Sequence, residues 1–350
     1  MLIIFALLCL ATVLSMKINL KGFNDGYLSV ENTQAVKGIF IIIVFMSHIR
    51  SYGDYSTEYD ALIIKGINYL GQLMVAMFLF YSGYGINESI KRKGKPYIDA
   101  MPKNRIYKTF KDFALAIILF LLVDIMFGQH YSWKHILLAF TGWTSIGNSN
   151  WYMFAIFTLY IITYLCFKLF YKHKYIAISA IVALSLVYIF VIQKVQGGWW
   201  CDTYLCYVAG MLYSCAKDRI EHFMKKIGTV GYLVVLLAVT GFYFAVADYR
   251  HGSIMYHNIV AIIFCMVIVV FTMRVSIRSK LLIWCGKNLF WLYILQRIPM
   301  FVLSQWNINS FNVPLFTVLC AAITVVLSII IVKAQGCIDN YQKKKIVKSM

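Results

Sequence analysis

The sequence has 350 residues, of which 61% are hydrophobic and only 13% are charged. Soluble globular chains are nearer to about 25% charged, so this composition excludes an ordinary soluble domain and requires lipid as the solvent. A net charge of +19 would suit a nucleic-acid partner, but the Lys and Arg residues cluster between apolar runs of helix length. We therefore expect a protein that contacts membrane lipid and no nucleic acid.

Apolar runs of helical length follow one another along the chain. Each has roughly 16–22 residues, close to the about 20 that span the hydrocarbon core. They predict an all-α, polytopic transmembrane helix bundle of about 11 spans, built as a single membrane-embedded domain over residues 1–350. The runs fall at about 1–16, 35–50, 67–86, 112–128, 152–171, 175–194, 200–216, 228–247, 254–273, 281–300 and 312–332.

The charges between these runs predict an orientation. One set of alternate loops holds 27 of the 33 Lys and Arg residues, and the other set holds six. Cytoplasmic loops carry the excess of positive charge, so the rich set is expected in the cytoplasm. An odd number of spans then places the N-terminus outside and the C-terminus inside. Lys17 and Lys21 follow the first apolar run, whereas a signal peptide carries its charge before that run, so we expect a retained helix.

The run at 35–50 contains two ionisable residues, Lys37 and His48. Eleven residues rotate a helix by only about 20° beyond three full turns and rise about 16 Å, so both side chains share one face. Ionisable groups inside a membrane are costly and are functional candidates by default. Histidine titrates near neutrality and can take a proton from a hydroxyl. The alternative is an interfacial histidine near a helix end.

The loop at 91–111 is the most basic stretch of the chain. Arg105 and Lys108 lie three residues apart and share a face if the next helix begins there. Basic groups at a cytoplasmic helix entrance can hold phosphates, such as those of coenzyme A. A topology signal, or contact with anionic lipid, would explain the same charges.

Four further residues are weaker candidates. Ser82 lies in a stretch of small residues that favours close helix packing, and Trp151 and Tyr152 begin a helix at the outer face. Aromatic residues there anchor helices at the interface, but they also suit stacking on a sugar ring. Asp124, inside the run at 112–128, would either orient His48 or pair with a lysine elsewhere. His130 and His135 lack zinc-ligand spacing, and we expect no metal site.

An ordered set of motifs resembles acyltransferase family 3, the membrane-bound bacterial enzymes that acylate sugars. Lys37, ten residues and His48 are similar to its basic-x10-His signature, and Arg105-x-x-Lys108 to its R-x-x-R motif. The remaining matches cover most of the chain: Phe80-Tyr81-Ser82-Gly83-Tyr84, Trp151-Tyr152-Met153, the stretch Tyr207 to Leu212, and Cys285-Gly286-Lys287-Asn288 with Tyr293. Gln296 stands where many members have a late histidine, and no acidic residue follows Met153, which leaves the acceptor open.

The resemblance implies a multi-pass enzyme of the bacterial plasma membrane. It implies that acyl-CoA, expected as acetyl-CoA, is the co-substrate with no other cofactor, and that the acceptor is a hydroxyl of a cell-surface or lipid-linked glycan, as in exopolysaccharide biosynthesis. His48 and Lys37 are then the catalytic candidates. Arg105, Lys108, Ser82, Trp151 and Tyr152 are the substrate-binding candidates.

Two other functions fit a chain of this kind. A glycolipid or polysaccharide transporter without chemistry would show paired interrupted helices and several deep charges. The sequence offers one deep charge, Asp124, and no paired breaks. A glycan polymerase or glycosyltransferase would show a large outer loop rich in charged residues, and the predicted outer loops are poor in them.

Overall fold

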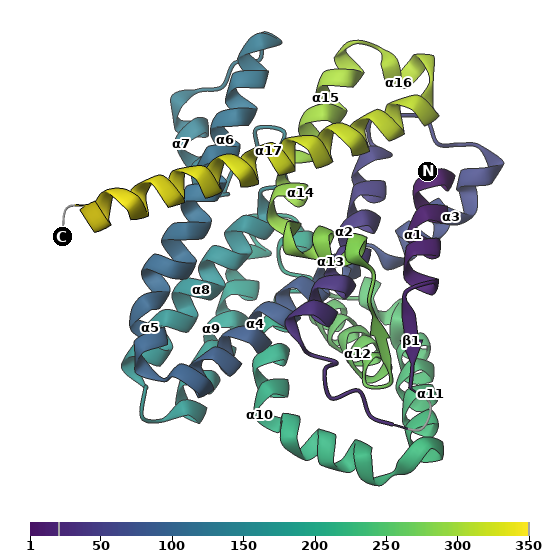
Figure 1. The fold of residues 1–350 in the computed structure, drawn as a ribbon, viewed down its shortest axis with the longest axis vertical. Coiled ribbons are helices and arrows are strands. Elements are labelled where there is room, and N and C mark those ends of the chain that lie inside the picture. The colour runs from purple at the N-terminus through teal and green to yellow at the C-terminus, as the bar shows by residue number, and fades with distance from the viewer. Residues whose placement is uncertain (20–21, 349–350) are drawn as a thin grey trace.

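A computed structural model describes residues 1–19 and 22–348 as a helical bundle with one small sheet (Figure 1). The first half of the chain contains α1 (Leu2–Val13), β1 (Met16–Ile18), α2 (Val30–Ile49), α3 (Glu58–Leu70), α4 (Leu73–Lys93), α5 (Lys95–Met101), η1 (Pro102–Tyr107), α6 (Lys108–Met126), α7 (Trp133–Phe140) and α8 (Trp151–Leu169). The second half contains α9 (Lys174–Ile192), η2 (Gly198–Trp200), α10 (Leu205–Lys226), α11 (Gly228–Val246), η3 (Ala247–His251), α12 (Ile254–Thr272), β2 (Val275–Ile277), α13 (Lys280–Lys287), α14 (Leu289–Leu295), α15 (Arg297–Gln305), α16 (Ile308–Phe311) and α17 (Val313–Lys348).

The helical bundle confirms the predicted fold class, but the predicted count of about eleven spans is not confirmed. By length and composition, six helical segments in the described chain can cross a membrane, and a seventh if α3 and α4, bent by 45°, form one span. The six are Val30–Ile49, Trp151–Leu169, Lys174–Ile192, Gly228–His251, Ile254–Thr272 and Val313–Ile338.

The other predicted spans differ for physical reasons. Helix α1 has only 12 residues. Helices α6 and α10 are long enough, but both carry several charged residues. The run at 281–300 is divided into α13, α14 and the start of α15. Pro299 has no N–H to donate to the carbonyl of Leu295, so the helix breaks at Gln296.

Two close helix crossings are built on pairs of glycines. At the crossing of α4 and α10, a Cβ atom on Gly83 would lie 1.9 Å from the Tyr207 carbonyl oxygen, and one on Gly210 would lie 2.0 Å from the Phe80 oxygen. Only residues without a side chain allow backbones to approach this closely. The motif glycine Gly83 therefore packs α4 against α10, as its small size predicts.

The crossing of α2 and α13 follows the same design. A Cβ atom on Gly38 would lie 2.0 Å from the Leu282 oxygen, and one on Gly286 would lie 1.8 Å from the Gln34 oxygen. Gly38 directly follows Lys37 in α2. The crossing thus fixes α13, and through it α14, against the helix that carries both catalytic candidates.

Loops predicted to share one side of the membrane contact one another. Strand β1 pairs antiparallel with β2, which joins the loops at 17–37 and 274–287. Lys168 forms an ion pair with Asp99, and Lys225 lies 2.6 Å from Asp25. All these segments belong to the set of loops rich in Lys and Arg.

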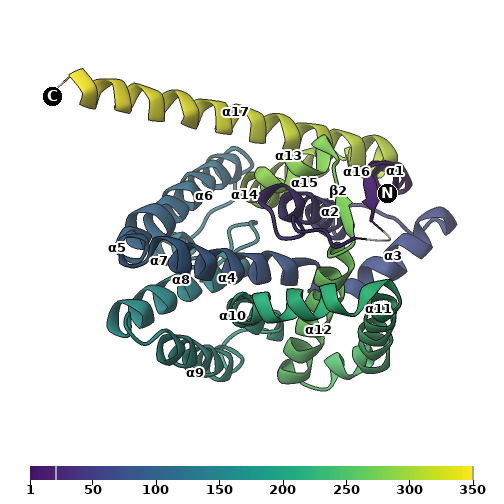
Figure 2. The same ribbon diagram turned by 60° about the horizontal axis from the view of Figure 1, so that its bottom comes forward.

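The loops that are poor in positive charge also meet. The Asn309 side chain donates to the Tyr52 carbonyl at 2.6 Å, which joins two of these loops, and Arg50 donates to Asn68 across the ends of one of them. The helices of the bundle connect these two groups of loops (Figures 1 and 2). The pairing agrees with the predicted alternation of loops, while the side that faces the cytoplasm remains a prediction from charge.

Candidate functional site

Helix α2 positions both catalytic candidates. Its start is fixed by Ser29, whose hydroxyl accepts the Asn32 N–H at 3.2 Å, and by Glu31 in the first turn. The Asn32 side chain in turn accepts the Ile277 N–H of β2 at 3.1 Å. From this anchored end the helix is continuous through Lys37 to His48, so the predicted shared face holds along its length.

Lys37 is within electrostatic range of Arg105, the first of the predicted donor-binding residues. The two side chains are close enough for their positive charges to interact. Arg105 donates from Nε to the Tyr97 hydroxyl at 3.1 Å and has Tyr160 and Tyr207 as further electrostatic neighbours. Arg105 is solvent-exposed although these tyrosines lie near it.

No carboxylate in the described part of the chain pairs with either cation. Two adjacent, uncompensated cations are suited to an anionic ligand such as a phosphate.

Lys108 does not join this cation pair. Its side chain is exposed at the start of α6 and makes no hydrogen bond or ion pair with the residues that the structure describes, although its backbone N–H donates to the Arg105 carbonyl. The prediction that Arg105 and Lys108 share a face assumed a regular helix. Instead, Arg105 lies in the π-helical turn η1, which begins at Pro102 and changes the angular spacing of the side chains.

Ser82 lies between the two ends of the candidate site. Its hydroxyl is 3.1 Å from the Tyr160 hydroxyl, on α8. Tyr160 also interacts with Arg105 and with Tyr152. A hydrogen bond thus joins Ser82 to Tyr160, and Tyr160 is within electrostatic range of Arg105 and of Tyr152 near the start of α8.

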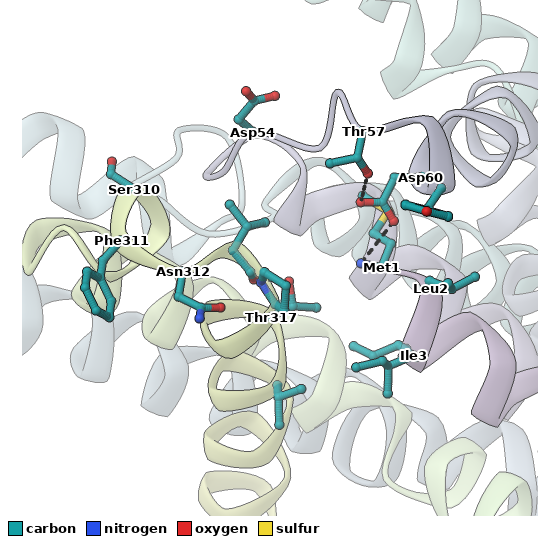
Figure 3. Close-up of a pocket in the computed structure, with 15 residues that line it drawn as sticks. Met1, Leu2, Ile3, Asp54, Thr57, Asp60, Ser310, Phe311, Asn312 and Thr317 are labelled. Carbon is teal, nitrogen blue, oxygen red and sulfur yellow. Dashed lines mark hydrogen bonds and ion pairs between the residues drawn. The ribbon is translucent and has the colours of Figure 1, made fainter.

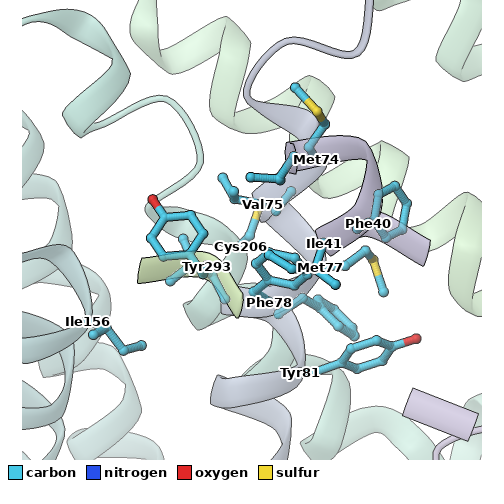
Figure 4. Close-up of a cluster of buried hydrophobic side chains, with 14 of the residues drawn as sticks. Phe40, Ile41, Met74, Val75, Met77, Phe78, Tyr81, Ile156, Cys206 and Tyr293 are labelled. Carbon is cyan, nitrogen blue, oxygen red and sulfur yellow. The ribbon is translucent and has the colours of Figure 1, made fainter. Parts of the chain in front are cut away.

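His48 lies in an aromatic environment near the end of α2. Its ring centroid is 6.2 Å from that of Tyr293, and Tyr293 is 5.4 Å from Tyr152. Trp151 packs edge-on against Tyr152 at 5.9 Å. Figure 4 shows Tyr293 among buried apolar side chains such as Ile41 and Phe78. The predicted residues His48, Trp151 and Tyr152 therefore lie in one cluster with Tyr293. We call these four residues the histidine cluster.

Among the residues that the structure describes, the imidazole of His48 has no carboxylate partner. Its Nδ1 atom is buried without a hydrogen-bond partner, and its charged neighbours are Arg297 and Arg50. Asp124 is buried in α6, and its neighbour is Tyr131. Of the two roles considered for Asp124, orientation of His48 is thus not supported by any contact in the structure.

Sequence reasoning missed Arg297 and gave Tyr293 no role beyond its place in a motif. Arg297 is a charged residue near the outer end of an apolar run, and that position was the available signal. Tyr160, the link between Ser82 and Arg105, offered no signal, because 25 tyrosines occur in this sequence.

A pocket of about 610 Å³ lies elsewhere, at the end of the bundle where α3 begins and α16 meets α17 (Figure 3). Met1, Asp60 and Thr317 are among its lining residues, and the Met1 amino group is 3.3 Å from the Asp60 carboxylate. None of the predicted site residues lines it, so its size does not make it the candidate site. The described residues contain no group of His, Cys, Asp and Glu that could hold a metal ion.

The fold and the histidine cluster define a multi-pass helical membrane protein with a basic site and a histidine site on one helix. A comparison with family models adds the identity of the family. The model described as "Acyltransferase domain", that of acyltransferase family 3, matches residues 31–333. The chain belongs to this family, as the ordered motifs predict, and is a membrane acyltransferase. Neither the curated proteins nor the solved structures contain a significant match.

Proposed function

We propose that the protein transfers an acyl group, expected as acetyl, from cytoplasmic acyl-CoA to a hydroxyl of a cell-surface or lipid-linked glycan. One observation carries the proposal: Lys37 is within electrostatic range of Arg105 at one end of α2, and the His48 ring lies near the Tyr293 ring about 16 Å further along the same helix. A donor with an anionic head and a long extended arm, which is the form of acyl-CoA, suits this separation.

Lys37 and Arg105 bind the phosphates of the donor in this proposal. Arg105 presents a planar fork of N–H donors that matches phosphate oxygens, and Lys37 adds a point charge. Ser82 and Tyr160 lie along the path of the pantetheine arm. Lys108 has only a long-range electrostatic role, because its side chain makes no hydrogen bond or ion pair with this group.

At the other end, His48 acts as the general base. It removes the proton from the glycan hydroxyl as the oxygen attacks the carbonyl carbon of the thioester. The tetrahedral intermediate then collapses, the C–S bond breaks, and the imidazolium returns the proton to the coenzyme A thiolate. Trp151, Tyr152 and Tyr293 offer aromatic faces to the sugar.

The donor half of the proposal is tested with the full chain in nanodiscs and a measurement of coenzyme A release from acetyl-CoA in the presence of glycan. Lys37→Ala is expected to reduce transfer, and Lys37→Arg to retain most of it, because the requirement is for a positive charge. Equal activity of Lys37→Ala and wild type would contradict the assignment of the donor site.

A transporter remains the rival function, because the structure contains a broken helix, α14–α15, beside His48. Transporters use such breaks to bind substrates. If the protein were a transporter, a variant of the site would lose glycan export, and coenzyme A release would not change. Family membership favours the acyltransferase.

A further inference from the structure

Arg297 is one of two cations, with Arg50, that are close enough for their charges to act on the proposed general base. It is the first residue of α15, and its charge acts on both His48 and Tyr293. Its Nε atom is buried and has no hydrogen-bond partner in the part of the chain that the structure describes. No carboxylate within the described ranges forms an ion pair with it. Arg297 is partly exposed, but an N–H donor that is buried without a partner is unfavourable, so this Nε calls for an explanation.

The break between α14 and α15 places this cation. Pro299 interrupts the helix, and beside the break the side chain of Gln296 donates to the Tyr293 carbonyl at 2.9 Å. Gln296 is only 1% exposed, so the break is a packed feature of the core. Tyr293 before the break and Arg297 after it therefore approach the imidazole from one fixed segment.

A positive charge in this position does not help a general base by itself, because it repels the imidazolium that forms when the base takes a proton. It becomes favourable when negative charge develops nearby. In acyl transfer that charge develops on the carbonyl oxygen of the thioester, and fixed donors aimed at this oxygen are usually the largest catalytic contribution. Two donor groups are in place, the Arg297 guanidinium and the Tyr293 hydroxyl. That hydroxyl is buried beside Ser149 and makes no hydrogen bond of normal geometry.

We propose that Arg297, together with the Tyr293 hydroxyl, stabilises the oxyanion of the tetrahedral intermediate. As the glycan oxygen bonds to the carbonyl carbon, the C=O π electrons move onto the oxygen, and N–H and O–H donors of these two residues hold the charge. When the C=O bond re-forms, the C–S bond breaks and the donors release the neutral ester. This inference rests on the proposed function.

The test compares Arg297→Gln, Arg297→Lys and Tyr293→Phe with wild type in nanodiscs, with acetyl-CoA as donor. Arg297→Gln is expected to lower kcat about 10²–10³-fold, as loss of an oxyanion donor does, with the KM for acetyl-CoA nearly unchanged. Arg297→Lys keeps the charge and should recover part of kcat, and Tyr293→Phe should lower kcat alone. Arg219→Gln, which removes an exposed arginine of α10, is the matched control and should retain wild-type kinetics.

Chemical rescue distinguishes a catalytic role of Arg297 from a purely structural one. Guanidinium ion added to Arg297→Ala should restore part of kcat if the charge acts on the reaction, and should restore nothing if the side chain only packs. A raised acceptor KM with unchanged kcat would assign Arg297 to an anionic group of the glycan and overturn the inference. Absence of transfer activity in the wild-type protein would contradict the proposed function itself. An active wild type with an equally active Arg297→Gln variant would remove only this inference.

Discussion

The close crossing of α4 and α10 predicts how alanine substitutions at two glycines of α4, Gly83 and Gly85, change the stability of the protein. A Cβ atom at position 83 would lie 1.9 Å from the Tyr207 oxygen, whereas at position 85 it would have no heavy atom within 4 Å. Ordinary contacts lie near about 3.5 Å, so Gly83→Ala must move the two backbones apart by about 1.5 Å. Gly85→Ala only exchanges a poor helix former for a good one.

The two variants should therefore differ in the sign of their effect on stability. Overpacking costs about 1–3 kcal/mol, and the clash with a backbone atom favours the upper end of that range. Gly85→Ala should gain up to about 1 kcal/mol. At roughly 2–4 °C per kcal/mol, Gly83→Ala should lower the apparent Tm by about 5–10 °C, while Gly85→Ala leaves it equal or higher.

The assay is thermal unfolding of the detergent-purified protein, followed by the loss of the monodisperse peak in size-exclusion chromatography. Gly210→Ala should push the same two backbones apart from the side of α10, since its Cβ would lie 2.0 Å from the Phe80 oxygen. The double variant with Gly83→Ala should thus lose less than the sum of the single losses. Equal Tm values for Gly83→Ala and Gly85→Ala would refute the close crossing.

Three further predictions follow from the site and the charge distribution. Arg105→Ala should raise the KM for acetyl-CoA in membranes while expression stays normal, and Arg105→Lys should recover only part of the affinity. Lys108→Ala should change the KM little. An unchanged KM for Arg105→Ala would mean that Arg105 serves only as a topology signal. Asp124→Asn should retain acyl transfer within about three-fold, because the carboxylate has no contact with His48; a loss of about 100-fold would show that it orients or charges the base. Cysteine labelling of intact cells should reach the 129–150 loop and miss the 91–111 loop, and the reverse pattern would invert the orientation.

Much of the fold was accessible from sequence because membrane helices follow simple rules. Apolar runs of the right length predicted the bundle, and the spacing of Lys37 and His48 placed both on α2, where the structure has them. Charge counting grouped the loops, and the pairing of β1 with β2 agrees with that grouping.

Local chemistry limited the prediction elsewhere. Hydropathy counts residues and does not register that Pro299 removes one hydrogen bond, so the run at 281–300 was predicted as one helix. The basic loop was predicted without structure, although α5, η1 and the start of α6 make it helical, because its charges mask the helix signal. The π-helical turn η1 also separates Lys108 from Arg105.

The histidine cluster depends on contacts between distant parts of the chain. Tyr152 and Tyr293 lie 141 positions apart in sequence, and their ring centroids are 5.4 Å apart. Motif resemblance drew attention to both residues without placing them together. Arg297 has no such motif, and only the structure shows that its charge acts on His48.

The central claim, that His48 is the general base of acyl transfer, is tested most directly by the acetyl content of the glycan. Cells that carry His48→Ala, His48→Gln or wild type are compared by NMR of the purified glycan, with protein levels matched. A positioned base contributes about 10²–10⁴-fold, so acetylation should fall by at least about 100-fold in both variants, since an amide cannot accept the proton. Near-normal acetylation with His48→Ala would contradict the account and favour a transporter.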